Sequence, residues 1–410
     1  MAIKDYDSSG YTIDAKVILG LDKDKITIDV SRYVNQISYT YTNFDLMPEL
    51  TISYLLDIKY ANLASLPYEL DLTIIEKGGN SGKDIPRGQI KGKFICFPER
   101  AELGNKSNDP NDTIRIPITD IFYPKDLTSL LNSEISLNIT GTDISGILQK
   151  LFKTARKSGG VSLKLGTLSK TRINNLALTR NKFYQHILFL YNTYGFTNQS
   201  PIWYADFNNI YFQSVNDNLV GDRTPITLYF DQDNLNKNYT IDNHYYLLRT
   251  PPSIDTEVPS RTLEYSKDVV MLMHPRHTIY KKKELDLKNL AQKDKTVSKL
   301  DNYKYFDQIK KTKTRLIAGN DNILTRQNEL SSDVSYNIIT SCNIIDPMIL
   351  TDFVIGRKVK YDTSVTDFFG YEMTGYIIST TISLASNNGV KWDGVCSLEI
   401  ANTSTGGVLK

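Results

Sequence analysis

The chain has 410 residues, which is enough for two to four compact units that each have their own core. Its hydrophobic content of 40% and charged content of 23% are ordinary for a globular protein and argue against wholesale disorder. The formal net charge of +2 provides no general attraction to nucleic acid or to an anionic membrane. The 26 tyrosines fall largely in strand-like runs, which favours a sheet protein with large contact surfaces.

Residues 1–120 are predicted to form a first β unit. From residue 11 to about 118, apolar and polar residues alternate, as expected of strands that bury one face. Loop-forming residues at 78–83 and 103–112 separate these runs, and short strands at this density predict a barrel or a sandwich. The inward positions are Ile13, Ala15, Val17, Leu19, Val34, Ile37, Tyr39, Tyr41, Leu50, Ile52, Tyr54, Leu56, Leu70, Leu72, Ile74, Ile90, Phe94 and Cys96.

Residues 121–202 are predicted to form a mixed α+β domain. A short strand at 135–139 is followed by Thr142 or Asp143, either of which offers an N-cap oxygen. Two basic residues and two glycines at 156–160 are expected to end the helix. Its apolar stripe consists of Ile144, Ile147, Leu148, Leu151, Phe152 and Ala155.

A second helix in this domain, at 183–194, leads directly into an aromatic hairpin. Gly195 follows the helix, where a left-handed C-cap favours a residue without a Cβ atom. Strands at 202–205 and 210–215 are then joined by a polar turn at 206–209. The helix has one apolar face, made of Phe183, Ile187, Leu190, Tyr191 and Tyr194.

Strands are predicted again in residues 203–260 and in residues 334–402, leaving 403–410 as a frayed tail. Prolines at 251, 252 and 259 make 250–260 a connection or an edge strand, because proline cannot sit in a central strand. The expected strands are 227–230, 245–248, 336–342, a pair around Gly356 within 353–361, and a closing hairpin of 375–384 and 392–401 around Asn388-Gly389.

Between these two parts lies an accessory segment, 261–333, whose stretch 281–313 is rich in lysine. Eleven lysines against five acids give this stretch a local charge of +6, and its leucines fit neither a helix nor a strand period. We expect an exposed excursion with at most a short helix. Tyr303, Tyr305 and Phe306 would also suit base stacking in a nucleic-acid contact, although such a run is more often a solvated face or an arm that orders on a protein partner.

The three cysteines are far apart and show no Cys-x-x-Cys spacing, which argues against a disulfide framework and a zinc knuckle. We expect Cys96, Cys342 and Cys396 to be reduced and buried. The start of the sequence lacks a basic region followed by an apolar one, and no apolar stretch approaches the roughly 18 residues of a membrane helix. These features predict a protein made and assembled in a reducing cytoplasm.

Catalytic motifs are absent from the sequence. It has no Gly-x-Ser-x-Gly elbow, no phosphate loop and no His-Glu-x-x-His. Other candidates are weak: His274 and His277 flank a proline and lack further ligands, and Asp231 and Asp233 lack the glycine and the distal glutamate of a calcium loop. His186 is expected to be a core histidine. His244, Glu49, Glu76 and Glu99 carry no specific signal, so we predict no enzyme, no catalytic residue, no cofactor and no metal.

The order of the parts resembles the phage tail baseplate central hub family, which is related to late control D proteins and to the hub part of type VI secretion spikes. The resemblance is carried by the helix that ends at Gly159, by Tyr194-Gly195-Phe196 leading into the aromatic hairpin, and by a closing hairpin. That hairpin begins Gly375-Tyr376-Ile377-Ile378 and ends Cys396-Ser397-Leu398-Glu399-Ile400. The implied fold class is mainly β with α+β insertions, with two β-barrel domains per chain plus small mixed accessory domains. The resemblance implies that the first barrel is residues 1–120 and that the second combines residues 203–260 with residues 334–402.

The resemblance implies a homotrimer whose six barrels form a pseudo-hexameric ring. Such a ring docks on the six-fold tail tube protein and on a trimeric central spike protein in the virion baseplate. The tail would be a contractile tail or a long flexible one, since hub-like proteins occur in both. Other baseplate proteins and the tape measure protein are further implied partners, with DNA only in passage through the ring and no membrane. No fused needle or lysozyme domain is evident, so a separate spike is implied.

Two other functions stay open at the level of sequence. A receptor-binding tail protein that holds host glycan in a barrel cleft would also use aromatic density, since rings stack on sugars. A cell-wall hydrolase is the second alternative, because paired carboxylates meet in space and cannot be identified by spacing.

Overall fold

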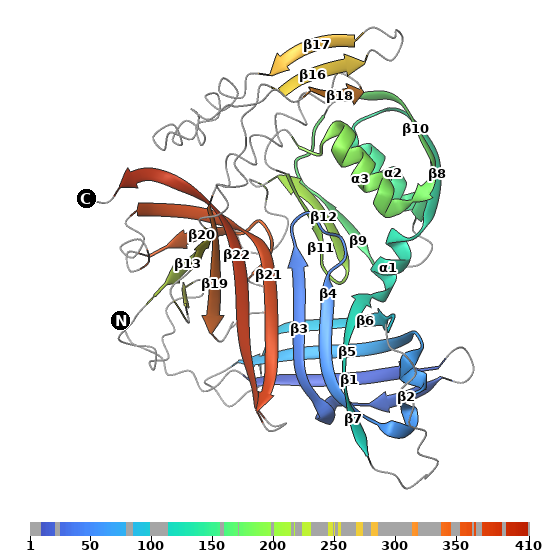
Figure 1. The fold of residues 1–410 in the computed structure, drawn as a ribbon, viewed down its shortest axis with the longest axis vertical. Helices are drawn as coiled ribbons and strands as arrows, with labels where there is room; N and C mark the ends of the chain where they lie inside the picture. Colours follow the sequence, from blue (N-terminus) through green and yellow to red (C-terminus); the bar gives the residue numbers. More distant parts are fainter. Residues whose placement is uncertain are drawn as a thin grey trace.

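The structure is a computed structural model that contains mainly strands and a few helices (Figure 1). Two β modules, a mixed α+β unit and a small three-stranded sheet make up the fold. The residues that it describes are 10–20, 25–78, 85–98, 114–155, 160–170, 172–197, 201–214, 217, 224–230, 245–248, 250, 253–255, 268–273, 280–285, 314–318, 338–345, 353–362, 365, 371–387 and 391–408.

The first β module has the strand order β2-β1-β5-β6-β7-β4-β3, and every neighbouring pair is antiparallel. In Figure 1, β1, β5 and β6 cross β3, β4 and β7 at a steep angle, as in an orthogonally packed barrel. The strands are β1 (Gly10–Leu19), β2 (Ile26–Asp29), β3 (Val34–Thr42), β4 (Glu49–Asp57), β5 (Tyr68–Gly78), β6 (Ile85–Cys96) and β7 (Arg115–Pro124).

The alternation predicted for this module is confirmed, since almost all of the predicted inward residues are buried and Ile90 packs partly buried against the core. The last strand, β7, continues beyond residue 120 to Pro124. Its alternation is harder to see in the sequence because the inward position 120 is an aspartate that is only 8% exposed.

The second β module has the order β14-β13-β20-β21-β22-β19-β15. The frayed tail predicted for 403–410 is wrong as far as residue 408: β22 continues to Val408, because β21 is long enough to pair with it through Tyr371. The strands are β13 (Ile226–Tyr229), β14 (Tyr245–Leu247), β15 (Ser253–Asp255), β19 (Ile338–Ile345), β20 (Lys358–Tyr361), β21 (Tyr371–Asn387) and β22 (Lys391–Val408).

The two modules repeat one strand order. When β1 to β7 are matched in chain order with β13, β14, β15, β19, β20, β21 and β22, the neighbours in the two sheets correspond one to one within the described residues. The two modules differ in the direction of one strand. β13 is parallel to both of its neighbours, whereas its counterpart β1 is antiparallel to both of its own. The chain therefore contains two β-barrel modules with a common order of strands.

The mixed unit has its own core, although Ile202, Tyr204 and Tyr211 of this unit belong to the core of the β modules. Two small sheets, β10-β8 and β11-β12-β9, pack with the helices, and β8 and β10 curve around α2 and α3 (Figure 1). The elements are α1 (Lys125–Leu131), β8 (Glu134–Thr142), α2 (Ile144–Ala155), β9 (Ser162–Leu165), β10 (Ile173–Lys182), α3 (Phe183–Tyr194), β11 (Pro201–Ala205) and β12 (Asn209–Ser214).

Both predicted helices are confirmed. All six residues of the α2 stripe are buried, and Asp143 caps the helix by accepting the Gly146 N–H at 2.9 Å. Gly195 has a φ of 69° and donates its N–H to the Tyr191 carbonyl at 3.0 Å, so it ends α3 as predicted. The residues 156–159 lie outside the described part of the chain.

The third sheet corrects the prediction for the accessory segment. We expected at most a short helix in residues 281–313, but residues 281–285 belong to the strand β17 (Tyr280–Leu285). It forms a sheet with β16 (Asp268–Met273) and β18 (Thr314–Ala318) in the order β17-β16-β18. The lysines at the start of the basic stretch form β17 because an apolar strand, β16, supplies an antiparallel partner for their backbone. Residues 286–313 lie outside the described part.

Candidate assembly interface

One continuous sheet joins the two β modules, because β3 pairs with β21. Seven antiparallel residue pairs connect them, from Thr42 opposite Ser379 to Gln36 opposite Ala385. Figure 1 shows the two strands side by side. Sequence reasoning identified both strands but not their pairing, since partners such as Ser38 and Ser383 are 345 residues apart.

Strand β21 changes its partner at a bulge. The Ile377 N–H donates to the Arg357 carbonyl at 3.0 Å, and the Ile377 carbonyl accepts from Gly356, on the side of the second module. One residue later the Ile378 carbonyl accepts the Asn43 N–H at 2.7 Å, on the side of the first module. The register of β21 shifts between Ile377 and Ser379, so the bulge lets one strand serve both modules.

The inner face of this joint is part of a single core. Tyr41 of β3 donates its hydroxyl proton to the Phe353 carbonyl at 2.5 Å, and Thr380 of β21 donates to the same carbonyl at 2.9 Å. All three residues are buried. The buried side chains of both modules form one continuous hydrophobic cluster, so the joint is a packed interface and not a flexible linker.

The outer face of the joint carries three cross-strand pairs of hydroxyl groups. The oxygens are 3.2 Å apart between Ser38 and Ser383, 3.0 Å between Thr40 and Thr381, and 3.2 Å between Thr42 and Ser379. Such pairs stabilise an antiparallel ladder and fix its register.

The aromatic hairpin β11–β12 attaches the mixed unit to the first module. Phe44 donates its backbone N–H to the Trp203 carbonyl at 2.8 Å, and Ala205 donates to the Asp45 carbonyl at 3.2 Å. The ring of Phe207, in the hairpin turn, stacks on Tyr39 of β3 with centroids 4.0 Å apart. These contacts place the hairpin against β3, the strand that forms the joint.

The polar turn of this hairpin is organised by Asp206. Its carboxylate accepts the backbone N–H groups of Asn208 and Asn209 at 2.8 and 2.7 Å, and the Tyr211 hydroxyl at 2.7 Å. Burial, together with the neighbouring Asp206 carboxylate, raises the pKa of Tyr211. The cluster is a structural turn rather than a reactive centre.

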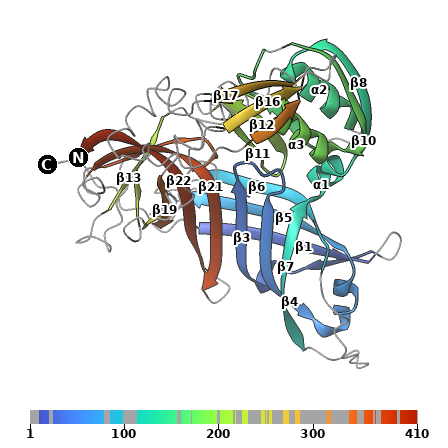
Figure 2. The ribbon, with the colours of Figure 1, turned by 45° about the horizontal axis from the view of Figure 1, so that its top comes forward.

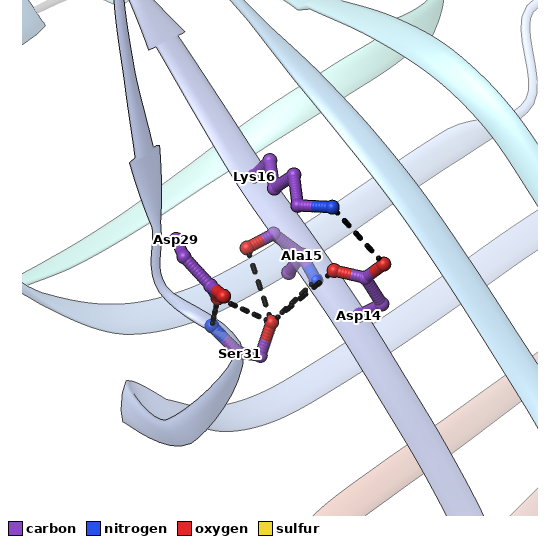
Figure 3. Close-up of polar contacts among 5 residues, drawn as sticks. All are labelled: Asp14, Ala15, Lys16, Asp29 and Ser31. Carbon is purple, nitrogen blue, oxygen red and sulfur yellow. Dashed lines mark hydrogen bonds and ion pairs between the residues drawn. The ribbon is translucent and has the colours of Figure 1, made fainter.

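At the far edge of the first module, Ser31 connects the edge strand β2 to its neighbour β1 through hydrogen bonds (Figure 3). The Ser31 hydroxyl donates to Asp29 at 2.6 Å and accepts the Ala15 N–H at 2.9 Å, while the Ser31 N–H donates to Asp29 at 3.0 Å. The hydrogen bonds from Ser31 lower the pKa of Asp29. Asp14 and Lys16 form an exposed ion pair beside this network, so charged side chains flank the edge strand.

A buried network of hydrogen-bonded side chains in the first module was not predicted from the sequence. The Tyr54 and Tyr68 hydroxyls are 2.8 Å apart, and Tyr68 donates to the buried carboxylate of Asp120. The available signal was an acid at an inward position of the alternating strand β7, with one tyrosine at an inward position of β4, which pairs with β7, and another at the start of β5.

The weak candidate residues named from the sequence do not converge on a reactive centre within the described residues. His186 is a core histidine, as predicted: it is 4% exposed, and its Nε2 donates to the Ile135 carbonyl at 3.0 Å. Glu49 is exposed on β4, and Glu76 lies in β5. The others lie outside the described residues: Glu99, Asp231, Asp233, His244, His274 and His277.

Two of the three cysteines are buried and form no disulfide, as predicted. Cys96 and Cys396 are 2% and 0% exposed, and burial raises the pKa of the Cys396 thiol. Cys342 lies in β19, opposite Leu398. Among the described residues, no helix is both long and apolar enough to cross a membrane, and no three His, Cys, Asp or Glu side chains are grouped so that they could hold a metal ion.

Comparison with solved structures identifies the fold. A tail protein from Neisseria meningitidis MC58 matches with a TM-score of 0.56 and 10% identity, over 98% of this chain and 98% of that chain. The 43 kDa tail protein of prophage MuSo2 from Shewanella oneidensis matches with a TM-score of 0.50 and 9% identity, over 94% and 98%. The chain has the fold of phage tail proteins. No family model and no curated protein matches the sequence.

Proposed function

We propose that this chain is the structural hub of a phage tail baseplate. In this role three copies form a pseudo-hexameric ring that adapts the six-fold tail tube to a three-fold central spike. The observation that supports it most is the repeated strand order of the two β modules together with the β3–β21 joint between them. The fold shared with the two tail proteins adds support.

The joint is of the kind from which rings are built. It is heterologous, since β3 of the first module meets β21, whose counterpart in the first module is β6 and not β3. Heterologous contacts between similar units close into rings when the rotation between units allows it. Two modules per chain and three chains give six similar units, which match the six-fold symmetry of a tube.

The proposed partners are those of the hub family that the sequence resembles. One face of the ring would contact the tail tube protein and the opposite face a trimeric spike protein, with other baseplate proteins and the tape measure protein around them. Assembly would occur in the host cytoplasm, and the finished protein would belong to the virion tail. Such an adapter acts through shape and strand pairing and needs no reacting group.

The purified full chain tests this proposal. Native mass spectrometry should give the mass of three chains, and electron microscopy should show a ring with three-fold symmetry and six similar densities. Incubation with the tail tube protein from the same source should place the ring at one end of the tube. A chain that stays monomeric with and without tube protein, or a ring of another order, would contradict the proposal.

A further inference from the structure

We infer that the contact between the aromatic hairpin and the first β module is a latch, which opens while the parts on both sides of it stay folded. We call this contact the hairpin seam and define it by Tyr39 and residues 43–45 of the first module and by residues 203–207 of the hairpin. Figure 1 and Figure 2 both show the hairpin between α3 and the end of β3. The inference concerns the single chain and does not depend on the proposed hub function.

Few backbone hydrogen bonds cross the hairpin seam. Two backbone N–H groups, those of Phe44 and Ala205, donate across it to backbone carbonyls, at 2.8 and 3.2 Å. Strand pairing across it, within the described residues, is limited to one isolated bridge between Asp45 and Tyr204. The joint that β3 forms with β21 has seven residue pairs. Opening the seam therefore breaks far fewer backbone bonds than opening the joint.

Buried polar groups at the hairpin seam have no hydrogen-bond partner among the described residues. They are the hydroxyls of Tyr39 and Tyr204 and the indole N–H of Trp203, and the three side chains are at most 4% exposed. A buried polar group without a partner raises the free energy of the closed form. On the same strand, the Tyr41 hydroxyl donates to the Phe353 carbonyl in the joint. Strand β3 thus has its hydroxyl paired on the side of the joint but not on the side of the hairpin.

The backbone at the hairpin seam is also strained. Phe44 has a φ of 67°, and no other non-glycine residue in the described part of the chain has a positive φ. A residue with a Cβ atom is disfavoured in this region, and phenylalanine lacks the polar side chain with which asparagine or aspartate compensates locally. The Phe44 N–H is bonded to the Trp203 carbonyl across the seam, so opening the seam frees this residue to relax.

Aromatic rings hold the hairpin seam closed. The Phe207 ring stacks on Tyr39 with centroids 4.0 Å apart and meets Phe94 edge-on at 4.9 Å. Burial of these rings favours the closed form, whereas the unpaired hydroxyls and the strained turn oppose it. The burial of one aromatic ring and the loss of one buried hydrogen bond are free energies of the same order. The closed and open forms are therefore close enough in free energy for the seam to open without global unfolding.

The parts on the two sides of the hairpin seam keep cores of their own when it opens. The core of the mixed unit surrounds α2 and α3, and the hairpin side chains in the core of the β modules are Ile202, Tyr204 and Tyr211. Opening withdraws these side chains and leaves the helices packed. It also uncovers aromatic rings on both sides. Since aromatic residues are enriched at protein interfaces, a partner protein that binds these rings would favour the open form.

Hydrogen exchange of the purified full chain measures the opening. Residue-resolved mass spectrometry compares the Phe44 and Ala205 N–H groups, which donate across the seam, with the Asn43 N–H, which donates to Ile378 in the joint. We expect the two seam groups to exchange at least about 100-fold faster than the joint group, while the N–H groups of α3 stay protected. Equal rates at the seam and at the joint would mean that the seam opens only with the β modules and would refute the inference.

Paired variants test the cause of the opening. Tyr39→Phe with Tyr204→Phe removes both unpaired hydroxyls and keeps the rings, so it should slow exchange of the seam groups at least about tenfold. Tyr41→Phe is the matched control, because it makes the same change on the same strand but removes a hydroxyl that is hydrogen-bonded. It should not slow exchange at the seam. Faster exchange at the seam after removal of the unpaired hydroxyls, or no change, would show that they do not oppose closure and would overturn the inference.

Phe207→Ala tests the latch from the opposite direction. The variant removes the ring that stacks on Tyr39 but alters a partly buried residue in a turn, so both cores should remain folded. Exchange of the seam groups should accelerate at least about tenfold, and exchange of the Asn43 N–H should not change. Equal acceleration at the seam and at the joint would contradict the latch, because the two contacts would then open together. Circular dichroism of each variant checks that the fold is retained.

Discussion

Asp120 illustrates at the residue scale how the first module accommodates an acid in its core. The carboxylate is 8% exposed and accepts a hydrogen bond from Tyr68, whose hydroxyl is also paired with that of Tyr54. A buried polar group is tolerated when its hydrogen bonds are made and is costly when one partner is removed.

Tyr68→Phe should therefore destabilise the protein by about 1–3 kcal/mol, because it removes a donor from a buried carboxylate while keeping the ring. The midpoint of urea unfolding measures the effect. Tyr60→Phe, at a half-buried ring beside Lys59, serves as the control and should change the midpoint little. Equal midpoints for the two variants would show that the Tyr68 hydroxyl contributes nothing.

A second residue-scale contact depends on pH. Burial alone would raise the pKa of Glu69, but hydrogen bonds from Lys125 at 2.8 Å and Lys25 at 3.1 Å lower it below 4.5. Because the folded protein favours the charged form, Glu69 contributes its full stabilisation above pH 4.5, and this is lost as the pH falls through the folded pKa.

Glu69→Gln should cost about 0.5–1 kcal/mol at pH 7, since both lysines are partly exposed and the ion pairs are screened. Thermal melting of the two proteins from pH 7 to pH 3 tests this. The difference in melting temperature should be largest near neutral pH and shrink toward acid. A difference that stays constant down to pH 3 would mean that the Glu69 charge is not the cause.

At the scale of elements, α2 shows where local sequence is sufficient. Its stripe repeats every three or four residues, and all six positions are buried in the core of the mixed unit. Strand β17 shows the opposite case, because its lysine-rich sequence is typical of a solvated segment and only the pairing with β16 makes it a strand.

Leu151→Asp should unfold the mixed unit, because an unpaired carboxylate at a fully buried position costs several kcal/mol, on the order of a domain's whole stability. Gln149→Asp introduces the same charge at an exposed position of the same helix and should melt like the wild type. Circular dichroism and limited proteolysis measure both variants. Wild-type melting of Leu151→Asp would contradict the burial of this face.

At the scale of the whole molecule, the two β modules are one structural body. Their buried side chains form one cluster, and β21 pairs with strands of both. The mixed unit has its own core and contacts β3 through the aromatic hairpin. We therefore expect the β modules to unfold together.

Ile382→Ala tests this coupling, because Ile382 is 2% exposed on β21 and lies opposite Tyr39 of β3. The cavity should cost about 2–5 kcal/mol, and hydrogen exchange should accelerate in β4 and β22 alike. Ile187→Ala creates a similar cavity in the mixed unit and should affect the β modules less. Faster exchange in only one β module after Ile382→Ala would show that the modules are independent.

The sequence by itself determined what depends on neighbours along the chain: the alternation of β1 and β3 to β5, the stripe of α2, the glycine that ends α3 and the aromatic hairpin. These features follow from periods of two or 3.6 residues and from backbone preferences, which are local properties. Only the tertiary structure decided that β3 pairs with β21 across 345 residues, that β21 changes partner at a bulge, and that Asp120 is buried. The physical reason is that strand pairing uses backbone groups common to every residue, so the choice of a distant partner leaves little trace in either strand's own sequence.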